Sequence, residues 1–192
     1  MGTKDFNILD DFIASWRLRQ VRQQVNRGGR LLDFGCGHQA FFLRSISSRI
    51  TKGIGLDYDA APGKIAPHIE ILNSRFSGVL EFPPHAFDQV SILAVLEHIP
   101  VDEVDILFRE FHRVLAPGGQ VLLTTPTPAA KPLLDFLAFR LNVISKPEIA
   151  DHKHYYPRED ILEVANRNGF ELKRYRTFQF GFNCLAVLEK ST

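Results

Sequence analysis

Apolar and polar positions recur along the chain with two periods, which predict helices and short buried strands in turn. Apolar residues at helical spacing predict an amphipathic helix over residues 8–25, which a glycine-rich stretch ends. The poorly patterned stretch around Pro62, Gly63 and Pro67 predicts one short helix. The other predicted helices run from 39 to before 53, over 101–115 and over 159–168, and the predicted strands cover 30–34, 52–59, 87–95, 120–126, 170–180 and 182–190.

This order of elements predicts an α/β fold, because strands that alternate with helices form a mostly parallel sheet with helices on both faces. The last two strands are separated only by Gly181 and its neighbours, so they must run antiparallel. We expect residues 1–192 to form a single domain, with an N-terminal helix in 1–26 and a lid or substrate-side insert in 127–157. The apolar part of this insert, 132–144, fits burial against the sheet or closure over an apolar substrate; membrane association is less favoured because the segment lacks a strongly basic face.

The composition is that of an ordinary globular protein, with 45% hydrophobic and 23% charged residues. A formal net charge of +1 gives no field that would attract a polyanion, so binding to nucleic acid is disfavoured. Cys36 and Cys184 show neither disulfide nor zinc-site spacing, which indicates a reducing compartment. The sequence has no signal-peptide pattern and no apolar run of about 18 residues, so we expect a cytoplasmic protein without stable membrane insertion; its oligomeric state stays open.

Candidate chemistry begins in the stretch LLDFGCGHQAFF, where a buried strand runs into Gly35, Cys36 and Gly37. Glycines between a strand and a helix let the backbone turn sharply and let a ligand approach main-chain N–H groups. Asp57 follows about 20 residues later at the end of the next strand, where an acid can accept hydrogen bonds from two ribose hydroxyls. Together these features predict a nucleoside-bearing ligand, and the alternative is a tight turn with a solvated acid.

Two further motifs follow in order, in the stretches FDQVSILAVLEHIP and RVLAPGGQVLLTTP. With LLDFGCG and GIGLDYD they closely resemble the class I S-adenosylmethionine-dependent methyltransferases, in particular the branch that acts on small molecules. The resemblance covers residues 31–126. It implies a Rossmann-like three-layer sandwich with a seven-stranded, mostly parallel sheet whose last strand is antiparallel.

The resemblance also implies a binding site for S-adenosylmethionine. Asp33 and the two glycines would line its methionine part, although Asp33 also fits a turn-capping acid. The sequence departs from the family at Gln39, which replaces a third glycine, and it lacks the Asp that often binds the adenine amino group. Adenine would then be held by main chain and by stacking near Phe76 and Ser77. The implied cofactor-binding residues are Asp33, Gly35, Cys36, Gly37, Asp57, Tyr58, Phe76, Ala94 and Val95, of which the last two would flank the sulfonium.

Candidate catalytic side chains are concentrated in the stretch DHKHYYPRED. His152, His154 and Tyr155 could supply a general base and hydroxyl donors for a small acceptor. The alternative is a polar loop that ends in a helix with Pro157 in its first turn. His98 directly precedes a predicted helix, and we expect it to be structural; the alternative is that it faces the substrate.

We therefore expect a methyltransferase that moves the methyl group of S-adenosylmethionine to a small organic acceptor, with oxygen as the accepting atom. S-adenosylhomocysteine would be the product, and we expect no metal. Two alternatives stay open. The literal match of Gly35, Gly37 and Ala40 to a dinucleotide turn favours an NAD-linked oxidoreductase, and the departures from the family pattern favour a non-catalytic cofactor-binding protein of the same fold.

Overall fold

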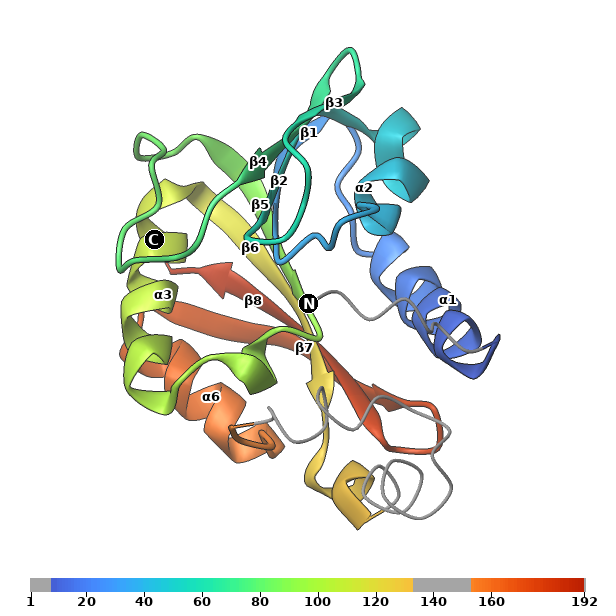
Figure 1. The fold of residues 1–192 in the computed structure, drawn as a ribbon. Helices are drawn as coiled ribbons and strands as arrows, with labels where there is room; N and C mark the ends of the chain where they lie inside the picture. The colour runs from blue at the N-terminus through green and yellow to red at the C-terminus, as the bar shows by residue number, and fades with distance from the viewer. Residues whose placement is uncertain (1–7, 133–152, 192) are drawn as a thin grey trace.

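The computed structural model describes residues 8–132 and 153–191, with side chains from Ala14 onward. Within these ranges eight strands form one sheet, in the order β3-β4-β2-β1-β5-β6-β8-β7, and helices lie on both of its faces (Figure 1). The strands are β1 Gly29–Phe34, β2 Ile50–Asp57, β3 Gly63–Ala66, β4 Ile69–Asn73, β5 Phe87–Leu93, β6 Leu115–Pro126, β7 Phe170–Phe178 and β8 Asn183–Lys190. The helices are α1 Ile8–Arg22, α2 Phe41–Ile46, α3 Val101–Val114 and α6 Arg158–Arg167, with short 3₁₀ helices η1 Ser47–Arg49, η2 Leu96–His98 and η3 Pro128–Ala130.

The strand pairing confirms the predicted fold class. β1 pairs in parallel with β2 and β5, β2 pairs in parallel with β4, and β5 pairs in parallel with β6. The last strand, β8, is antiparallel to both β6 and β7. The carboxyl ends of β1, β2 and β5 therefore meet at one edge of the sheet, where open α/β sheets bind their ligands.

The sheet has one strand more than the seven that we predicted, because β3 adds an antiparallel edge strand beside β4. The prediction of a short helix in this stretch was wrong. Pro62 and Pro67 bracket only the four residues of β3, which are too few for a helix. Their backbone groups pair with β4 instead, so that Gly63 lies opposite Ile71.

Alternate residues of β1 show how the sheet divides the core. Leu31 packs among side chains of α1 and α2, whereas Leu32 packs on the opposite face among side chains of α3 and α6. α3 presents one apolar face to this second layer, as its spacing predicted, and the residues Val104, Leu107, Phe108, Phe111 and Val114 are all buried. The result is the predicted three-layer sandwich, with α3 and α6 on one side and α1 and α2 on the other (Figure 1).

Residues 74–86, called the strap below, connect β4 to β5 without a helix or strand of their own. Arg113 of α3 holds the strap by donating to the carbonyl oxygens of Phe82 at 2.7 Å and Leu80 at 2.8 Å. Glu110 accepts the N–H of Leu80 at 2.8 Å and forms an ion pair of 2.6 Å with Arg113. The arginine of the RVLAPGG motif thus fixes the segment that covers this face of the sheet.

Several predicted boundaries shift; β6, for example, begins at Leu115 rather than at residue 120. α1 ends at Arg22 rather than at residue 25, and α2 is a short helix that begins only at Phe41, because Ala40 before it lies in the left-handed region at φ +48. The predicted insert 127–157 is described only at its two ends, and the apolar lid beyond Pro132 lies outside the described residues.

Candidate functional site

The glycine loop connects the carboxyl end of β1 to α2. Gly35 and Gly37 have φ values of +74 and +67, which favour glycine. A Cβ atom on Gly35 would come within 2.4 Å of Cγ2 of Val95, whereas Gly37 faces open space. The N–H groups of Gly35 and Cys36 both donate to the carbonyl oxygen of Leu56, at 2.8 and 3.1 Å. The loop is therefore fixed against β2 and against the residues that follow β5.

Asp57, the predicted ribose ligand, ends β2 beside this loop. Its Oδ2 accepts the N–H of Gly37 at 2.9 Å, and its Oδ1 accepts the N–H of Asp59 at 2.9 Å. Each carboxylate oxygen keeps further acceptor capacity after one such bond. The carboxylate is thus held in one orientation and can still accept hydrogen bonds from a ligand. Tyr58 is exposed, with the guanidinium of Arg75 5.8 Å from its ring centroid.

Asp33 lies in β1, directly before the loop, and is only 2% exposed. Its Oδ1 accepts the hydroxyl of Ser91 in β5 at 2.7 Å. Burial raises the pKa of Asp33 to about 7, the bond from Ser91 lowers it, and the charge of Asp57 raises it further. Among the described residues the carboxylate of Asp33 accepts no backbone N–H, so Asp33 does not cap a turn in this structure.

Two other predicted cofactor residues, Ala94 and Cys36, lie directly after β5 and in the glycine loop. Ala94, directly after β5, has φ +55, which is uncommon for a residue with a Cβ atom. Cys36 turns its side chain toward the sheet, where its Sγ would lie 2.7 Å from a Cβ atom on Gly55. Burial raises the pKa of the Cys36 thiol, so this side chain stays protonated.

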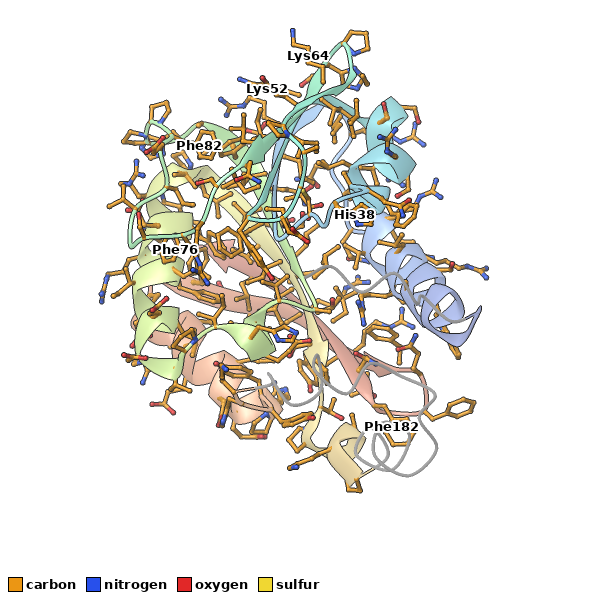
Figure 2. All side chains as sticks on the ribbon, in the orientation of Figure 1. His38, Lys52, Lys64, Phe76, Phe82 and Phe182 are labelled. Carbon is orange, nitrogen blue, oxygen red and sulfur yellow. The ribbon has the colours of Figure 1, made fainter. Side chains whose placement is uncertain are left out.

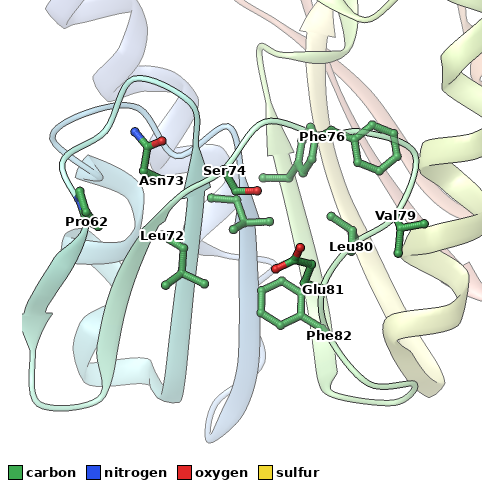
Figure 3. A pocket seen from close by; sticks show the side chains of 11 residues that line it. Pro62, Leu72, Asn73, Ser74, Phe76, Val79, Leu80, Glu81 and Phe82 are labelled. Carbon is green, nitrogen blue, oxygen red and sulfur yellow. The ribbon is translucent and has the colours of Figure 1, made fainter.

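A cavity of about 350 Å³ opens between the strap and the carboxyl ends of β1, β2 and β4 (Figure 3). This volume lies in the range of about 300–1,000 Å³ that is typical of small-molecule sites. Phe76, predicted to stack on adenine, lines the cavity and packs edge to face on Phe34 at 5.9 Å. Figure 2 shows Phe76 and Phe82 on the side of α3, and His38 of the glycine loop on the side of α2. The lining residues are Phe34, Leu56, Pro62, Leu72, Asn73, Ser74, Phe76, Val79, Leu80, Glu81 and Phe82.

Beyond the predicted residues, Glu97 in η2 is a buried acid, and the half-buried Arg17 of α1 lies close enough for its charge to act on it. Glu97 is 1% exposed, and its Oε2 accepts the hydroxyl of Thr125 at 3.0 Å. Burial raises the pKa of Glu97, and the charge of Arg17 acts in the opposite direction. The Nε atom of Arg17 is buried without a hydrogen-bond partner. The only sequence signal for this pair is an acid in the otherwise apolar run ILAVLEHIP.

The segment that carries the predicted catalytic residues lies beside Glu97. The N–H of Lys153 donates to the carbonyl oxygen of Glu97 at 2.6 Å, which attaches the segment to η2. The ring of Tyr155 lies 5.9 Å from Nζ of Lys131. His152 lies outside the described residues. This segment is therefore joined to the end of β5, and the glycine loop contacts the same stretch through Val95.

His154 forms a defined pair with an acid of α6. Its Nε2 lies 2.7 Å from Oδ2 of Asp160, and both side chains are partly exposed. The ring of Tyr156 packs edge to face on His154 with centroids 4.5 Å apart. Burial raises the pKa of Tyr156 to about 12, and its hydroxyl is buried without a partner. The pair with Asp160 fixes the histidine ring. Residues 153–157 form a loop that ends at Pro157, directly before α6, which also fits the polar-loop alternative.

Comparison with known families decides between the nucleotide-binding alternatives. A family model described as a methyltransferase domain matches residues 7–174, which is most of the chain. The chain belongs to the methyltransferase domain family. The resemblance carried by the ordered sequence motifs is thereby confirmed, and the family of NAD-linked oxidoreductases is not supported.

Curated relatives of this methyltransferase domain are ubiquinone biosynthesis O-methyltransferases. The enzyme of Pseudomonas fluorescens (strain SBW25) is 29% identical over 130 residues, which cover 63% of this chain and 54% of the relative. The enzyme of Vibrio cholerae serotype O1 (strain O395) is 25% identical over 167 residues, which cover 81% of this chain and 67% of the relative. The chain spans about half the length of the Pseudomonas relative that it matches.

Solved structures agree on the fold of this methyltransferase domain. A S-adenosylmethionine-dependent methyltransferase of Methanosarcina mazei matches with a TM-score of 0.66 and 19% identity, over 90% of this chain and 97% of the other. One from Mesorhizobium loti matches with a TM-score of 0.67 and 19% identity, over 90% and 96%. The [4+2]-cyclase SpnF matches with a TM-score of 0.69 and 16% identity, over 93% and 81%. At these identities the likeness shows the fold alone.

Among the side chains that the structure describes, in residues 14–132 and 153–191, no group of three His, Cys, Asp or Glu is placed to hold a metal ion. Over residues 8–132 and 153–191, the helices are too short or too polar to span a membrane.

Proposed function

We propose that this methyltransferase domain transfers the methyl group of S-adenosylmethionine to a hydroxyl oxygen of a small organic acceptor. Membership of the family supports methyl transfer, and the names of the curated relatives support an oxygen acceptor. The observation that carries the proposal is the carboxylate of Asp57. Two backbone N–H groups hold it at the end of β2, beside the glycine loop and near the cavity, in an orientation suited to ribose hydroxyls.

The residues present fit this cofactor. Gly35 leaves backbone that a Cβ atom would otherwise fill, and Asp33 places a carboxyl group below the loop for the cationic methionine end. Arg17 brings a guanidinium whose Nε is buried without a partner, which suits the carboxylate of the methionine part. The adenine base would occupy the cavity beside Phe76, and Ala94 and Val95 would flank the sulfonium. S-adenosylmethionine, when bound, supplies an electrophilic methyl group on a good leaving group.

The protein then has to align the acceptor oxygen with the methyl group, exclude water and remove one proton from the acceptor. His154 is the proton acceptor that the geometry favours, because Asp160 can hold its Nε2–H and leave Nδ1 free to accept a proton. His152 and Tyr155 belong to the same segment, and we retain them as further candidates for this step. Asp160 would position the ring and stabilise its protonated form.

Calorimetric titration with S-adenosylhomocysteine tests the cofactor assignment. We expect saturable binding to the wild type and a loss of at least about tenfold in affinity for Asp57→Ala, because hydrogen bonds to a charged group contribute about 1.5–3 kcal/mol each. Lys64→Ala, in the exposed edge strand β3, is the matched control and should bind as the wild type does. Absence of binding at millimolar ligand, or equal binding by Asp57→Ala, would contradict the proposal.

Methyl transfer itself needs a separate measurement, because the fold is shared with a [4+2]-cyclase. A panel of phenols, catechols, hydroxy acids and sugars, assayed for release of S-adenosylhomocysteine, distinguishes an enzyme from a protein that only binds the cofactor. Turnover of any hydroxyl acceptor supports the proposal. Cofactor binding with no turnover across the panel would favour the non-catalytic alternative.

A further inference from the structure

The cavity under the strap has a polar rim. Asn73, the last residue of β4, contributes its carboxamide to the rim beside Ser74. Most of the other lining side chains are apolar and can only pack against the faces of a flat ring. Recognition of the polar edge of a base therefore depends on few groups.

The carboxamide of Asn73 is held in one orientation. Its Nδ2 donates to the carbonyl oxygen of Tyr58 at 3.0 Å and to that of Ala60 at 2.9 Å. Only the NH₂ side of an amide can face two carbonyl oxygens, so these bonds decide which way the group points. Figure 3 shows the consequence: the nitrogen points away from Phe76, and the oxygen lies on the side of Ser74 and Phe76. Both donors are used, whereas Oδ1 offers an acceptor toward the cavity.

We propose that Oδ1 of Asn73 accepts a hydrogen bond from the exocyclic amino group of adenine and so determines the base specificity of the site. This inference rests on the proposed function, because it takes S-adenosylmethionine as the ligand. The same carboxamide holds the carbonyls of Tyr58 and Ala60, which lie one and three positions after Asp57, the proposed ribose ligand. One side chain therefore links recognition of the base to the loop that presents the ribose ligand.

Glu81 is the competing acceptor, since its carboxylate also lines the cavity. It lies in the strap, is exposed, and no hydrogen bond to another described residue fixes its position. An acceptor that is already oriented loses less conformational entropy on binding than a free side chain does. The geometry therefore favours Asn73, and Glu81 provides a matched control in the same cavity.

The test compares two ligands that differ only at the base. S-adenosylhomocysteine carries an amino group at the position where S-inosylhomocysteine carries an oxygen. In the inosyl ligand this oxygen would face Oδ1 of Asn73, and no proton would lie between the two oxygens. We expect the wild type to bind the adenosyl ligand at least about tenfold more tightly, because a site built for a hydrogen bond rejects an analogue that cannot form it. In Asn73→Ala and Asn73→Ser this ratio should fall to about threefold or less, and Glu81→Gln should keep the wild-type ratio.

The ratio separates base recognition from a structural role. If Asn73 served only to hold the loop at Tyr58 and Ala60, its replacement would weaken both ligands equally and leave the ratio unchanged, which would overturn the inference. A wild-type ratio near one, or a ratio that falls in Glu81→Gln instead, would overturn it as well. Failure of the wild type to bind either ligand would contradict the proposed function. The thermal midpoint of each variant, measured alongside, shows that the folded protein is being titrated.

Discussion

The buried carboxyl group of Asp33 lowers the stability of the fold at neutral pH, and we predict that Asp33→Asn raises it. Asn is nearly isosteric with Asp, and its carbonyl oxygen can still accept the hydroxyl of Ser91 that lies 2.7 Å from Oδ1. The substitution removes only the charge that burial disfavours. A gain in stability from a single substitution in the core is unusual, so the direction alone is informative.

The size of the expected stability gain follows from the pKa of Asp33. Burial raises the pKa of Asp33 from 3.8 to about 7, and each pKa unit corresponds to about 1.4 kcal/mol. Between these two values the folded state binds a proton that the unfolded state has lost, so the free energy of unfolding falls as pH rises through this window. The total loss is about 4 kcal/mol, complete above pH 7 or so and absent below about pH 4. The side chain introduced by Asp33→Asn does not titrate, so this variant does not lose stability as the pH rises through this window.

Urea unfolding at pH 5, 6, 7 and 8, followed by circular dichroism, measures the difference between wild type and variant. We expect Asp33→Asn to be more stable by about 1–2 kcal/mol at pH 5 and by about 4 kcal/mol at pH 8. A difference that does not change with pH, or a less stable variant at pH 8, would refute the reasoning. Ser91→Ala is the control: it removes a donor to the carboxylate and should destabilise the wild type most at high pH.

Three further predictions concern the loop, the strap and the proton acceptor. Gly35→Ala should lower the free energy of unfolding by at least about 2 kcal/mol and abolish binding of S-adenosylhomocysteine. Gly37→Ala, whose added Cβ atom meets open space, should lower the free energy of unfolding by about 1 kcal/mol. Urea unfolding and calorimetry measure these effects, and equal effects of the two variants would contradict the geometry. Arg113→Gln should lower the free energy of unfolding by about 1–3 kcal/mol and weaken cofactor binding because the strap loosens; a variant with unchanged binding would separate the strap from the site. His154→Gln should lower kcat by about 10²-fold or more, and Asp160→Asn by a smaller factor at unchanged KM, in initial-rate assays with an accepted substrate; full activity of His154→Gln would exclude it as the proton acceptor.

Much of the fold could be predicted because its signals are local. The period of the apolar residues in α3 and the short loop before β8 are properties of neighbouring residues, and they fix helix type and strand direction without distant information. β3 was missed because a strand of four residues is too short to show alternation, and only its pairing with β4 defines it.

The same difference between local and distant signals applies to the candidate site. The glycine loop and Asp57 could be placed from sequence, because a strand, a turn and a strand end leave little freedom in space. Arg17 and Glu97 are 80 positions apart, and nothing local indicates that the charge of one acts on the other. Asn73 gave no signal either, since its role depends on which carbonyls its amide meets after folding.

The strap shows how a family motif and a ligand site can depend on each other. No helix or strand forms in the connection from β4 to β5. The segment that covers the cavity therefore lacks regular backbone hydrogen bonds of its own. Arg113 and Glu110 supply the missing bonds by binding the backbone of Leu80 and Phe82, two residues that also line the cavity. The arginine of the motif thus holds two residues of the cavity wall without lining the cavity itself, so we expect it to affect a ligand through the strap. Its replacement should therefore reduce affinity and leave untouched the ratio between adenosyl and inosyl ligands, which depends on Asn73.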